Sequence, residues 1–151
     1  MGVSYQHQSV TEEKLKDFAS NDYFVESWGK STSFNIGAFI FTLFWLAYRK
    51  MYLYTFLYVV IHSVLFYILT ATVDSNIYAW IVNLALCIVF GFLGNRLYLH
   101  FAESKVARIA RMYADPGEQQ ERISQAGGTS LGAVYVVGIY YAVIFVIYMN
   151  I

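Results

Sequence analysis

The sequence contains few charged residues. Asp, Glu, Lys and Arg make up 13% of its 151 residues, against roughly 25% in ordinary soluble domains. Hydrophobic residues make up 58% of the chain, and a soluble protein of this size buries too small a share of its surface to hide them. The composition therefore excludes an ordinary soluble domain and indicates an integral membrane protein. The net charge of zero indicates no general attraction to nucleic acid.

Residues and motifs that support chemistry are also scarce. The one cysteine, Cys87, cannot form an intrachain disulfide. The sequence has no Gly-rich phosphate loop, no HExxH, no Cys-x-x-Cys and no GxSxG motif. Apart from His62, no Asp, Glu, Lys, Arg or His lies inside a long apolar run, which argues against a secondary transporter. We therefore predict no catalytic residue, no cofactor and no metal site, and a protein that is not an enzyme.

Four apolar runs are present instead, at residues 34–48, 51–71, 77–95 and 131–149. A helix needs about 20 residues to cross about 30 Å of hydrocarbon, and the last three runs meet that length. The first run reaches only about 22 Å as a helix. The predicted fold is an all-α integral membrane protein with three transmembrane helices and one short re-entrant or in-plane segment. The alternative is four transmembrane helices, with the first tilted or thinning the bilayer.

The polar segments form the remaining predicted parts. Residues 1–33 are predicted to be a cytoplasmic segment with an amphipathic helix that Thr11 caps. We expect this helix to lie on the membrane surface; the alternative is that it touches only the protein's own cytoplasmic loops. No apolar stretch follows a basic start here, so we expect no cleaved signal peptide. Residues 34–151 are predicted to form a single membrane domain, in which residues 96–130 are a cytoplasmic helix extension and loop.

The third long run is predicted to continue beyond the membrane as one helix from about Ile77 to about Tyr113, because good helix formers follow it. The residues Asp115-Pro116-Gly117 stop this helix. A turn at Gly127-Gly128 then precedes the last helix, which Thr129 or Ser130 caps.

The positive charges distinguish the two topologies, because short cytoplasmic loops collect Lys and Arg. Residues 1–33 hold three of the ten, residues 49–50 hold two, residues 96–122 hold five and the loop 72–76 holds none. If the first run crosses the membrane, the charges divide seven to three between the two sides. If it returns to the side it entered, all ten lie on one side. The charges favour the second topology, with a cytoplasmic N-terminus and a periplasmic or external C-terminus.

The stretch FNIGAFIFTLFWLAYRKMY, residues 34–52, resembles a signature that reads roughly Phe/Trp-Asn-Trp-x-Ala-Phe-x-Phe-Gly-Pro-x-Trp-x-x-Tyr-Arg-Lys-Met-Tyr. This signature belongs to a family of small bacterial inner-membrane proteins classed as a domain of unknown function. Two departures are Ile36 in place of Trp and Thr42-Leu43 in place of Gly-Pro. Without that helix breaker, a continuous helix in the interface becomes a variant of the re-entrant bend. The matching residues are Asn35, Ala38, Phe39, Phe41, Trp45, Tyr48, Arg49, Lys50, Met51 and Tyr52.

The resemblance extends beyond the signature to nearly the whole chain. Residues 21–24 and Trp28 resemble the segment that precedes it, and residues 94–98 and 127–130 match later landmarks. The resemblance implies a location in the bacterial inner membrane. It implies no settled activity.

Three groups of residues are candidate functional positions. A basic pair beside aromatic side chains at headgroup depth indicates anionic-lipid or partner binding, or simply a membrane anchor. Polar side chains inside the membrane are functional candidates, although interhelical hydrogen bonding is the ordinary explanation. A basic juxtamembrane segment binds anionic lipid or sets topology. The group at headgroup depth is Asn35, Trp45, Tyr48, Arg49, Lys50 and Tyr52. The polar group inside the membrane is His62, Asn83 and Asn95. The basic juxtamembrane group is Arg96, Lys105, Arg108 and Arg111.

His62 raises a further hypothesis. It lies near the middle of its apolar run, and hairpin symmetry about residues 74–75 puts Cys87 at a matching level. A Cys–His pair binds metal or supplies a thiolate nucleophile, but two ligands do not make a zinc site. The alternative is a neutral histidine that is hydrogen-bonded between helices.

The predicted function is that of a non-enzymatic accessory or interaction subunit of a membrane assembly. The expected partners are the lipid bilayer with its anionic headgroups, and a protein partner or a second copy of the chain. The first alternative is a small transport or channel component, which requires Asn35, His62 and Asn83 to face one cavity. The second is a membrane enzyme that acts on lipid, with His62 or Arg49 in its site.

Overall fold

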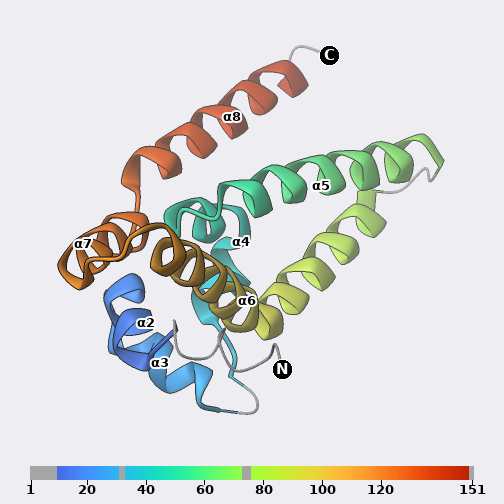
Figure 1. Ribbon diagram of the computed structural model, residues 1–151. Helices are drawn as coiled ribbons and strands as arrows, with labels where there is room; N and C mark the ends of the chain where they lie inside the picture. Colours follow the sequence, from blue (N-terminus) through green and yellow to red (C-terminus); the bar gives the residue numbers. More distant parts are fainter. Residues whose placement is uncertain (1–9, 31–32, 73–75, 150–151) are drawn as a thin grey trace. The chain divides into compact units, whose positions relative to one another are not determined.

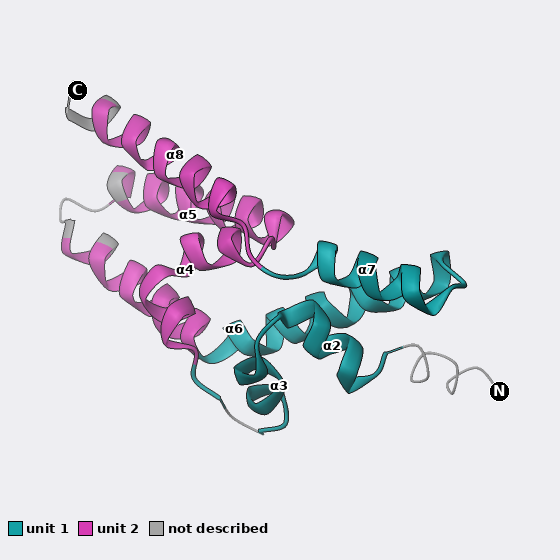
Figure 2. Cartoon of the chain, turned by 90° about the vertical axis from the view of Figure 1, so that its left-hand side faces the viewer, with its two compact units in different colours: residues 1–34, 92–128 teal, residues 35–91, 129–151 magenta. Residues whose placement is uncertain are grey.

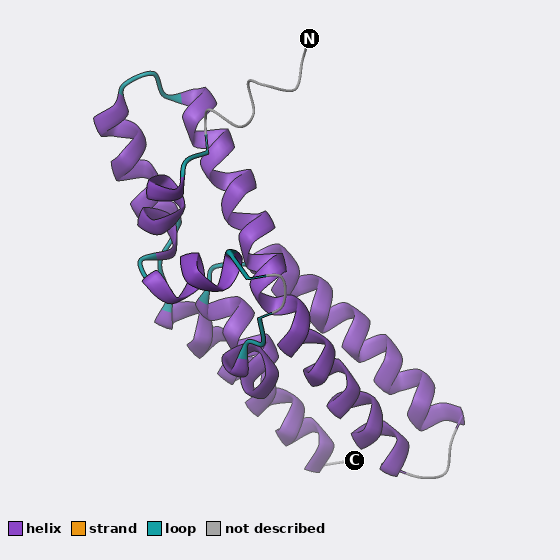
Figure 3. Ribbon diagram, turned by 90° about the horizontal axis from the view of Figure 1, so that it is seen from below, coloured by secondary structure: helices purple, strands orange, loops and turns teal. Residues whose placement is uncertain are grey.

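The computed structural model describes residues 10–30, 33–72 and 76–149, which form helices joined by short loops (Figure 1). No strand occurs among these residues (Figure 3). The predictions for residues 1–9, for the loop residues 73–75 and for the last two residues lie outside the described part. The helices are α2 (Glu12–Ala19), α3 (Asp22–Trp28), α4 (Ile36–Tyr48), α5 (Tyr52–Thr72), α6 (Asn76–Met112), α7 (Pro116–Ala126) and α8 (Leu131–Met149).

Three helices, α5, α6 and α8, are long and apolar enough to cross a membrane. The apolar helix α4 has only 13 residues, or about 20 Å of helix. The prediction of an all-α fold with three long apolar helices and one short one is therefore confirmed. The predicted continuous helix from Ile77 to Tyr113 is also found, as α6.

The chain divides into two compact units (Figure 2). Unit 1 combines residues 1–34 with residues 92–128, and unit 2 combines residues 35–91 with residues 129–151. The long helix α6 contributes its first part to unit 2 and its second part to unit 1. The polar N-terminal segment thus packs with other polar segments of the chain. The prediction that it lies on the membrane surface stays a prediction. The prediction that residues 34–151 form a single membrane domain stays a prediction.

Aromatic rings form the core of unit 1. Tyr98 on α6 is fully buried, and its ring centroid lies 4.9 Å from that of Phe24 and 5.6 Å from that of Trp28. Phe18 on α2 lies 6.2 Å from Tyr98 and meets Phe101 edge-on at 5.9 Å. These contacts explain how α2 and α3 form with 8 and 7 residues, because isolated helices of that length are marginal in water.

Helix α7 was missed by the sequence analysis, which placed a loop after Asp115-Pro116-Gly117. The Asp115 carboxylate caps α7 by accepting a hydrogen bond from the Glu118 backbone N–H at 2.8 Å. Pro116 occupies the first turn, where its missing N–H has no intrahelical partner to lose. The same three residues therefore end α6 and begin α7, and only the first role was predicted.

Helix α7 packs on α2. The turn that follows α7 adds a backbone hydrogen bond between them. The Gly128 backbone N–H donates to the Phe18 carbonyl oxygen at 2.8 Å. A Cβ at Gly127 would overlap that carbonyl group, so the close approach requires glycine. Along the helices, Lys14 Nζ donates to Gln119 Oε1 at 2.9 Å. The double glycine predicted as a turn also docks the end of α7 onto the end of α2.

In unit 2, α4 packs against both α5 and α8. Ser130 caps α8, since its Oγ accepts a hydrogen bond from the Ala133 N–H at 3.3 Å. Tyr58 on α5 meets Phe90 on α6 with ring centroids 5.3 Å apart. This contact agrees with the hairpin symmetry about residues 74–75 that the sequence predicts for α5 and α6.

Candidate functional site

Asn35 caps α4 and bonds its N-terminal end to α6. Its side-chain oxygen caps the helix by accepting a hydrogen bond from the Ala38 N–H at 2.8 Å. Its own backbone N–H donates to the carbonyl oxygen of Gly91 on α6, also at 2.8 Å. The residue is 3% exposed. Asn35 therefore positions α4 within unit 2 and does not present its amide to a lipid headgroup.

The basic pair Arg49-Lys50 forms the turn that ends α4. The Lys50 N–H donates to the Ala47 carbonyl and the Met51 N–H to the Leu46 carbonyl, both at 3.0 Å. Lys50 has φ 57°, in the left-handed region. This is the Schellman arrangement, in which a left-handed residue lets two N–H groups satisfy the last carbonyls of a helix. Leu46 and Met51 are fully buried and supply the apolar contact that accompanies the motif.

The turn separates the two basic side chains. Arg49 is 8% exposed, with its guanidinium carbon 5.6 Å from the centroid of the Tyr48 ring. Lys50 is partly exposed. Trp45 is buried as well, whereas Tyr52 is 54% exposed. Of the residues predicted to meet lipid headgroups, Lys50 and Tyr52 present their side chains and Tyr48 is half-buried. Asn35, Trp45 and Arg49 pack inside unit 2.

Replacing Lys50 by glycine is expected to stabilise unit 2 relative to Lys50→Ala. Both variants remove the charge, but only glycine adopts φ 57° without a clash of its Cβ, a difference of about 1 kcal/mol. Urea unfolding of the purified protein in mild detergent, followed by circular dichroism, measures this difference. Equal stability of the two variants would contradict the left-handed conformation at residue 50.

The two ends of α4 are tied to α6 and to the start of α8. Tyr48 lies just before the start of α5, and its carbonyl oxygen accepts a hydrogen bond from the Ser130 N–H at the start of α8, at 2.8 Å. Asn35 bonds to Gly91, which lies late in the apolar part of α6. In an antiparallel hairpin, the start of one helix and the late part of the next lie together. The two ends of α4 are therefore held at the start of α8 and late in the apolar part of α6.

The middle of α4 lies further along those helices. The Phe44 ring stacks on Tyr141 with centroids 5.6 Å apart, and Tyr141 is about 16 Å along α8 from Ser130. Thr42 Oγ1 lies 3.8 Å from the Cys87 sulfur on α6. The backbone of α4 also leaves helical geometry at Phe41, with φ −118° and ψ 23°. These contacts describe a kinked segment whose middle contacts both α6 and α8.

The recess beside His62 is not lined by the two amides that the transport alternative requires. The His62 ring stacks on Tyr58 at 5.7 Å and lines a recess of about 360 Å³ that also includes Ser63 and Tyr140. Neither Asn35 nor Asn83 lines this recess. The transport alternative requires His62 and both amides to face one cavity, and the recess at His62 does not meet that requirement.

Cys87 has neighbours other than His62. Its Sγ lies 3.9 Å from Asn83 Oδ1, one turn back on α6, and 3.8 Å from Thr42 Oγ1. Within the described residues, no group of three His, Cys, Asp or Glu side chains is placed to hold a metal ion. The geometry thus places a hydroxyl and an amide beside the thiol.

Asn95 and the basic juxtamembrane residues belong to unit 1. Asn95 is 1% exposed, and its Nδ2 donates to Ser33 Oγ at 2.9 Å. Lys105 lies over the Phe101 ring, with Nζ 5.6 Å from the centroid. The four predicted basic residues are all exposed along the second part of α6, and they are Arg96, Lys105, Arg108 and Arg111.

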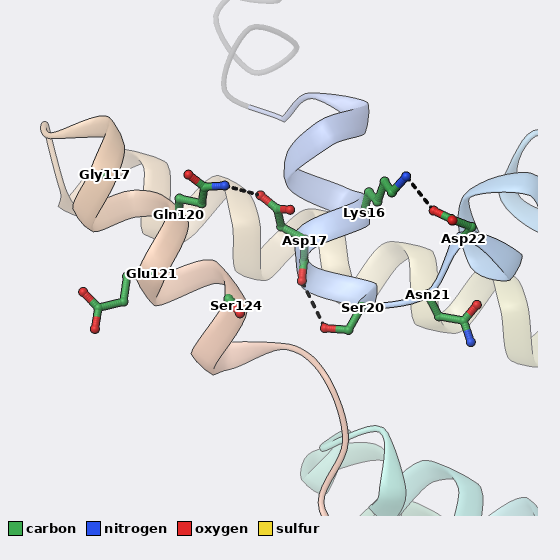
Figure 4. Close-up of a pocket in the computed structure, with 9 residues that line it drawn as sticks. All are labelled: Lys16, Asp17, Ser20, Asn21, Asp22, Gly117, Gln120, Glu121 and Ser124. Atoms are coloured by element: carbon green, nitrogen blue, oxygen red, sulfur yellow. Dashed lines mark hydrogen bonds and ion pairs between the residues drawn. The ribbon is translucent and has the colours of Figure 1, made fainter.

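An open polar groove in unit 1 is the site that sequence reasoning missed (Figure 4). It measures about 630 Å³ and lies among α2, the start of α3 and α7. Gln120 Nε2 on α7 donates to Asp17 Oδ2 on α2 at 3.2 Å across the groove. The two walls are about one hundred residues apart in sequence, so no local pattern joins them. The sequence does contain one sign of this groove: Asp-Pro-Gly is typical of the start of a helix, and the helix that begins there, α7, forms one wall.

The charges of the groove are mostly negative. Lys16 Nζ lies 2.7 Å from Asp22 Oδ1, and this hydrogen bond and the charge of Asp22 raise the pKa of the Lys16 ammonium group. Lys16 therefore stays charged at neutral pH and offsets one carboxylate. Asp17 and Glu121 supply two further carboxylates among the lining residues, so the groove favours a positively charged ligand.

Fold and sites together define a small helical protein whose described residues include three helices able to cross a membrane and a polar helical unit. The chain belongs to the family described as "Protein of unknown function (DUF2628)", which it matches over residues 10–103. This match covers α2 to the second part of α6, and it ends before α7 and α8. No curated protein and no solved structure matches the chain.

Proposed function

We propose that this protein is a non-enzymatic, multi-pass protein of the bacterial inner membrane that serves as an interaction subunit of a membrane assembly. Unit 2, with the apolar helices α4, α5 and α8, would anchor it. Unit 1 would present the binding surface. The observation that carries this proposal is the polar groove of α2 and α7, because its walls are held by hydrogen bonds and buried aromatic rings while the groove itself stays open.

The partner proposed for the groove is a basic segment of another membrane-associated protein. Asp17 and Glu121 line the groove and carry negative charge, and charge complementarity supports the encounter and register of two proteins. The groove is polar rather than apolar, which favours a partner that associates reversibly.

The proposed orientation places unit 1 in the cytoplasm. All ten Lys and Arg residues lie on one side if α4 returns to the side it entered. The contacts at the two ends of α4 support that path, since Tyr48 lies just before the start of α5 and Asn35 bonds to Gly91, late in the apolar part of α6. The last residues of the chain would then be periplasmic.

Glu121→Lys is expected to lower the recovery of the partner at least tenfold, because like charges facing each other across an interface cost several kcal/mol. The measurement is affinity purification of the full chain in mild detergent after crosslinking in cells, with bound proteins quantified by mass spectrometry. Glu103→Lys makes the same change of charge at an exposed position of α6 outside the groove, and it should leave recovery unchanged. Equal losses in both variants, or a protein that purifies alone, would overturn the proposal.

A further inference from the structure

Unit 1 contains a second recess with different chemistry. It measures about 450 Å³ and lies where the end of α3 and the residues after it meet α6. Trp28, Lys30 and Ser33 line it from the N-terminal segment, and Phe92 and Arg96 line it from α6. None of its lining residues belongs to the groove of α2 and α7.

The walls of this recess are held by hydrogen bonds. Asn95, which is 1% exposed, lines it and donates from Nδ2 to Ser33 Oγ at 2.9 Å. The Trp28 indole N–H donates to the Asn95 carbonyl oxygen at 3.0 Å. Since the Ser33 oxygen accepts the Asn95 bond, its own proton can be donated to a ligand. The buried Asn95 thus positions the indole through its backbone carbonyl oxygen and the Ser33 hydroxyl group through its side-chain amide.

Two cationic side chains give the recess its charge. Lys30 supplies an ammonium group and Arg96 a guanidinium group, and both residues are exposed. A guanidinium group forms two parallel hydrogen bonds to phosphate oxygens, and an ammonium group adds a compact charge. With the hydroxyl of Ser33, these groups match a phosphodiester with one negative charge.

The other end of the recess is apolar. Phe92 and Leu93 line it and are 59% and 44% exposed. They lie in the apolar run of α6 just before Arg96, the first charged residue of that helix. A ligand that fills both ends carries a phosphate next to a hydrocarbon chain.

We propose that this recess binds the headgroup of an anionic phospholipid, with its phosphate at Lys30, Arg96 and Ser33 and its acyl chain along Phe92 and Leu93. The apolar end distinguishes this ligand from a soluble phosphate compound. Juxtamembrane basic residues attract anionic lipid, and each one contributes roughly fivefold in affinity. The proposal is independent of the groove of α2 and α7, because the two sites share no residue.

The test is native mass spectrometry of the full chain in mild detergent, titrated with phosphatidylglycerol or with phosphatidylcholine. We expect the wild-type protein to retain one phosphatidylglycerol more tightly than any phosphatidylcholine. The variant Lys30→Gln/Arg96→Gln should bind phosphatidylglycerol roughly 30-fold more weakly, as the loss of two basic groups implies. The charge-conserving variant Lys30→Arg/Arg96→Lys should retain most of the binding.

The matched control is Lys14→Gln/Arg122→Gln, which removes the same charge from positions of unit 1 outside the recess. It should leave the retained lipid in place. Equal binding by Lys30→Gln/Arg96→Gln and the wild type would overturn the proposal, and so would an equal loss in the control. Displacement of the lipid by millimolar inorganic phosphate would assign the site to a soluble phosphate compound and also overturn it. Recovery of a protein partner, tested with Glu121→Lys, does not depend on any of these outcomes.

Discussion

In the Gly127→Ala variant, α7 is expected to separate from α2 and unit 1 to lose about 3 kcal/mol of stability. A methyl group at this position would overlap the backbone carbonyl group of Phe18. Backbone atoms cannot move aside as the end of a flexible side chain can, so the whole turn must shift. That shift also breaks the 2.8 Å hydrogen bond from Gly128 to Phe18. Hydrogen–deuterium exchange of residues 12–28 in mild detergent measures the loss.

The matched control is Gly138→Ala on α8. A Cβ there meets nothing within 4 Å, and alanine is the better helix former. Protection in α8 should therefore stay the same or rise slightly. Protection in α5, which belongs to unit 2, should not change in Gly127→Ala. Unchanged exchange of residues 12–28 in Gly127→Ala would contradict the close packing of the turn against α2.

Single cysteines at Lys50 and Ser104 are expected to resist a membrane-impermeant thiol reagent in whole cells, while a cysteine at Ser75 reacts. The background is Cys87→Ser, which removes the native thiol. The expected difference is all or none, because a bilayer either separates the reagent from a residue or does not. It follows from the proposed path of α4, which enters and leaves on the cytoplasmic side.

Two further positions complete this measurement. A cysteine at Asn150 should react in whole cells, and a cysteine at Ser33 should not. Inside-out vesicles should reverse the whole pattern. Reaction at Lys50 and Ser104 in whole cells, with Ser75 protected, would mean that α4 crosses the membrane. The chain would then have four spans, and the proposed cytoplasmic position of the second part of α6 would fail.

The helices of this protein are largely predictable from local sequence. Apolar runs of about 20 residues predict long apolar helices, and the observed α5, α6 and α8 follow the predicted runs closely. The cap at Thr11 was also predicted, and its Oγ1 accepts the Lys14 N–H at 3.4 Å. Helix α7 is not predicted from the sequence, because Asp-Pro-Gly indicates the end of a helix, although Pro in the first turn equally indicates the start of one.

The candidate sites were less predictable. Arg49 and Lys50 are adjacent in sequence, but the left-handed backbone at Lys50 turns one side chain inward and leaves the other partly exposed. Hairpin symmetry put His62 level with Cys87. The contact of Tyr58 with Phe90 between α5 and α6 agrees with such a hairpin, but His62 and Cys87 have different neighbours. A register along the helix axis does not specify which way each side chain faces around that axis.

The sequence by itself determined that this protein is helical, that three of its helices can cross a membrane and where those helices begin and end. These properties depend on apolar content, helix length and capping residues, all of which act over a few consecutive positions. Only the tertiary structure decided that α2 packs on α7, that α4 reaches the middle of α8, and that Lys30 and Arg96 line one recess. Such contacts join residues far apart in the chain, and they depend on the shapes of buried side chains and on the close approach that Gly127 permits.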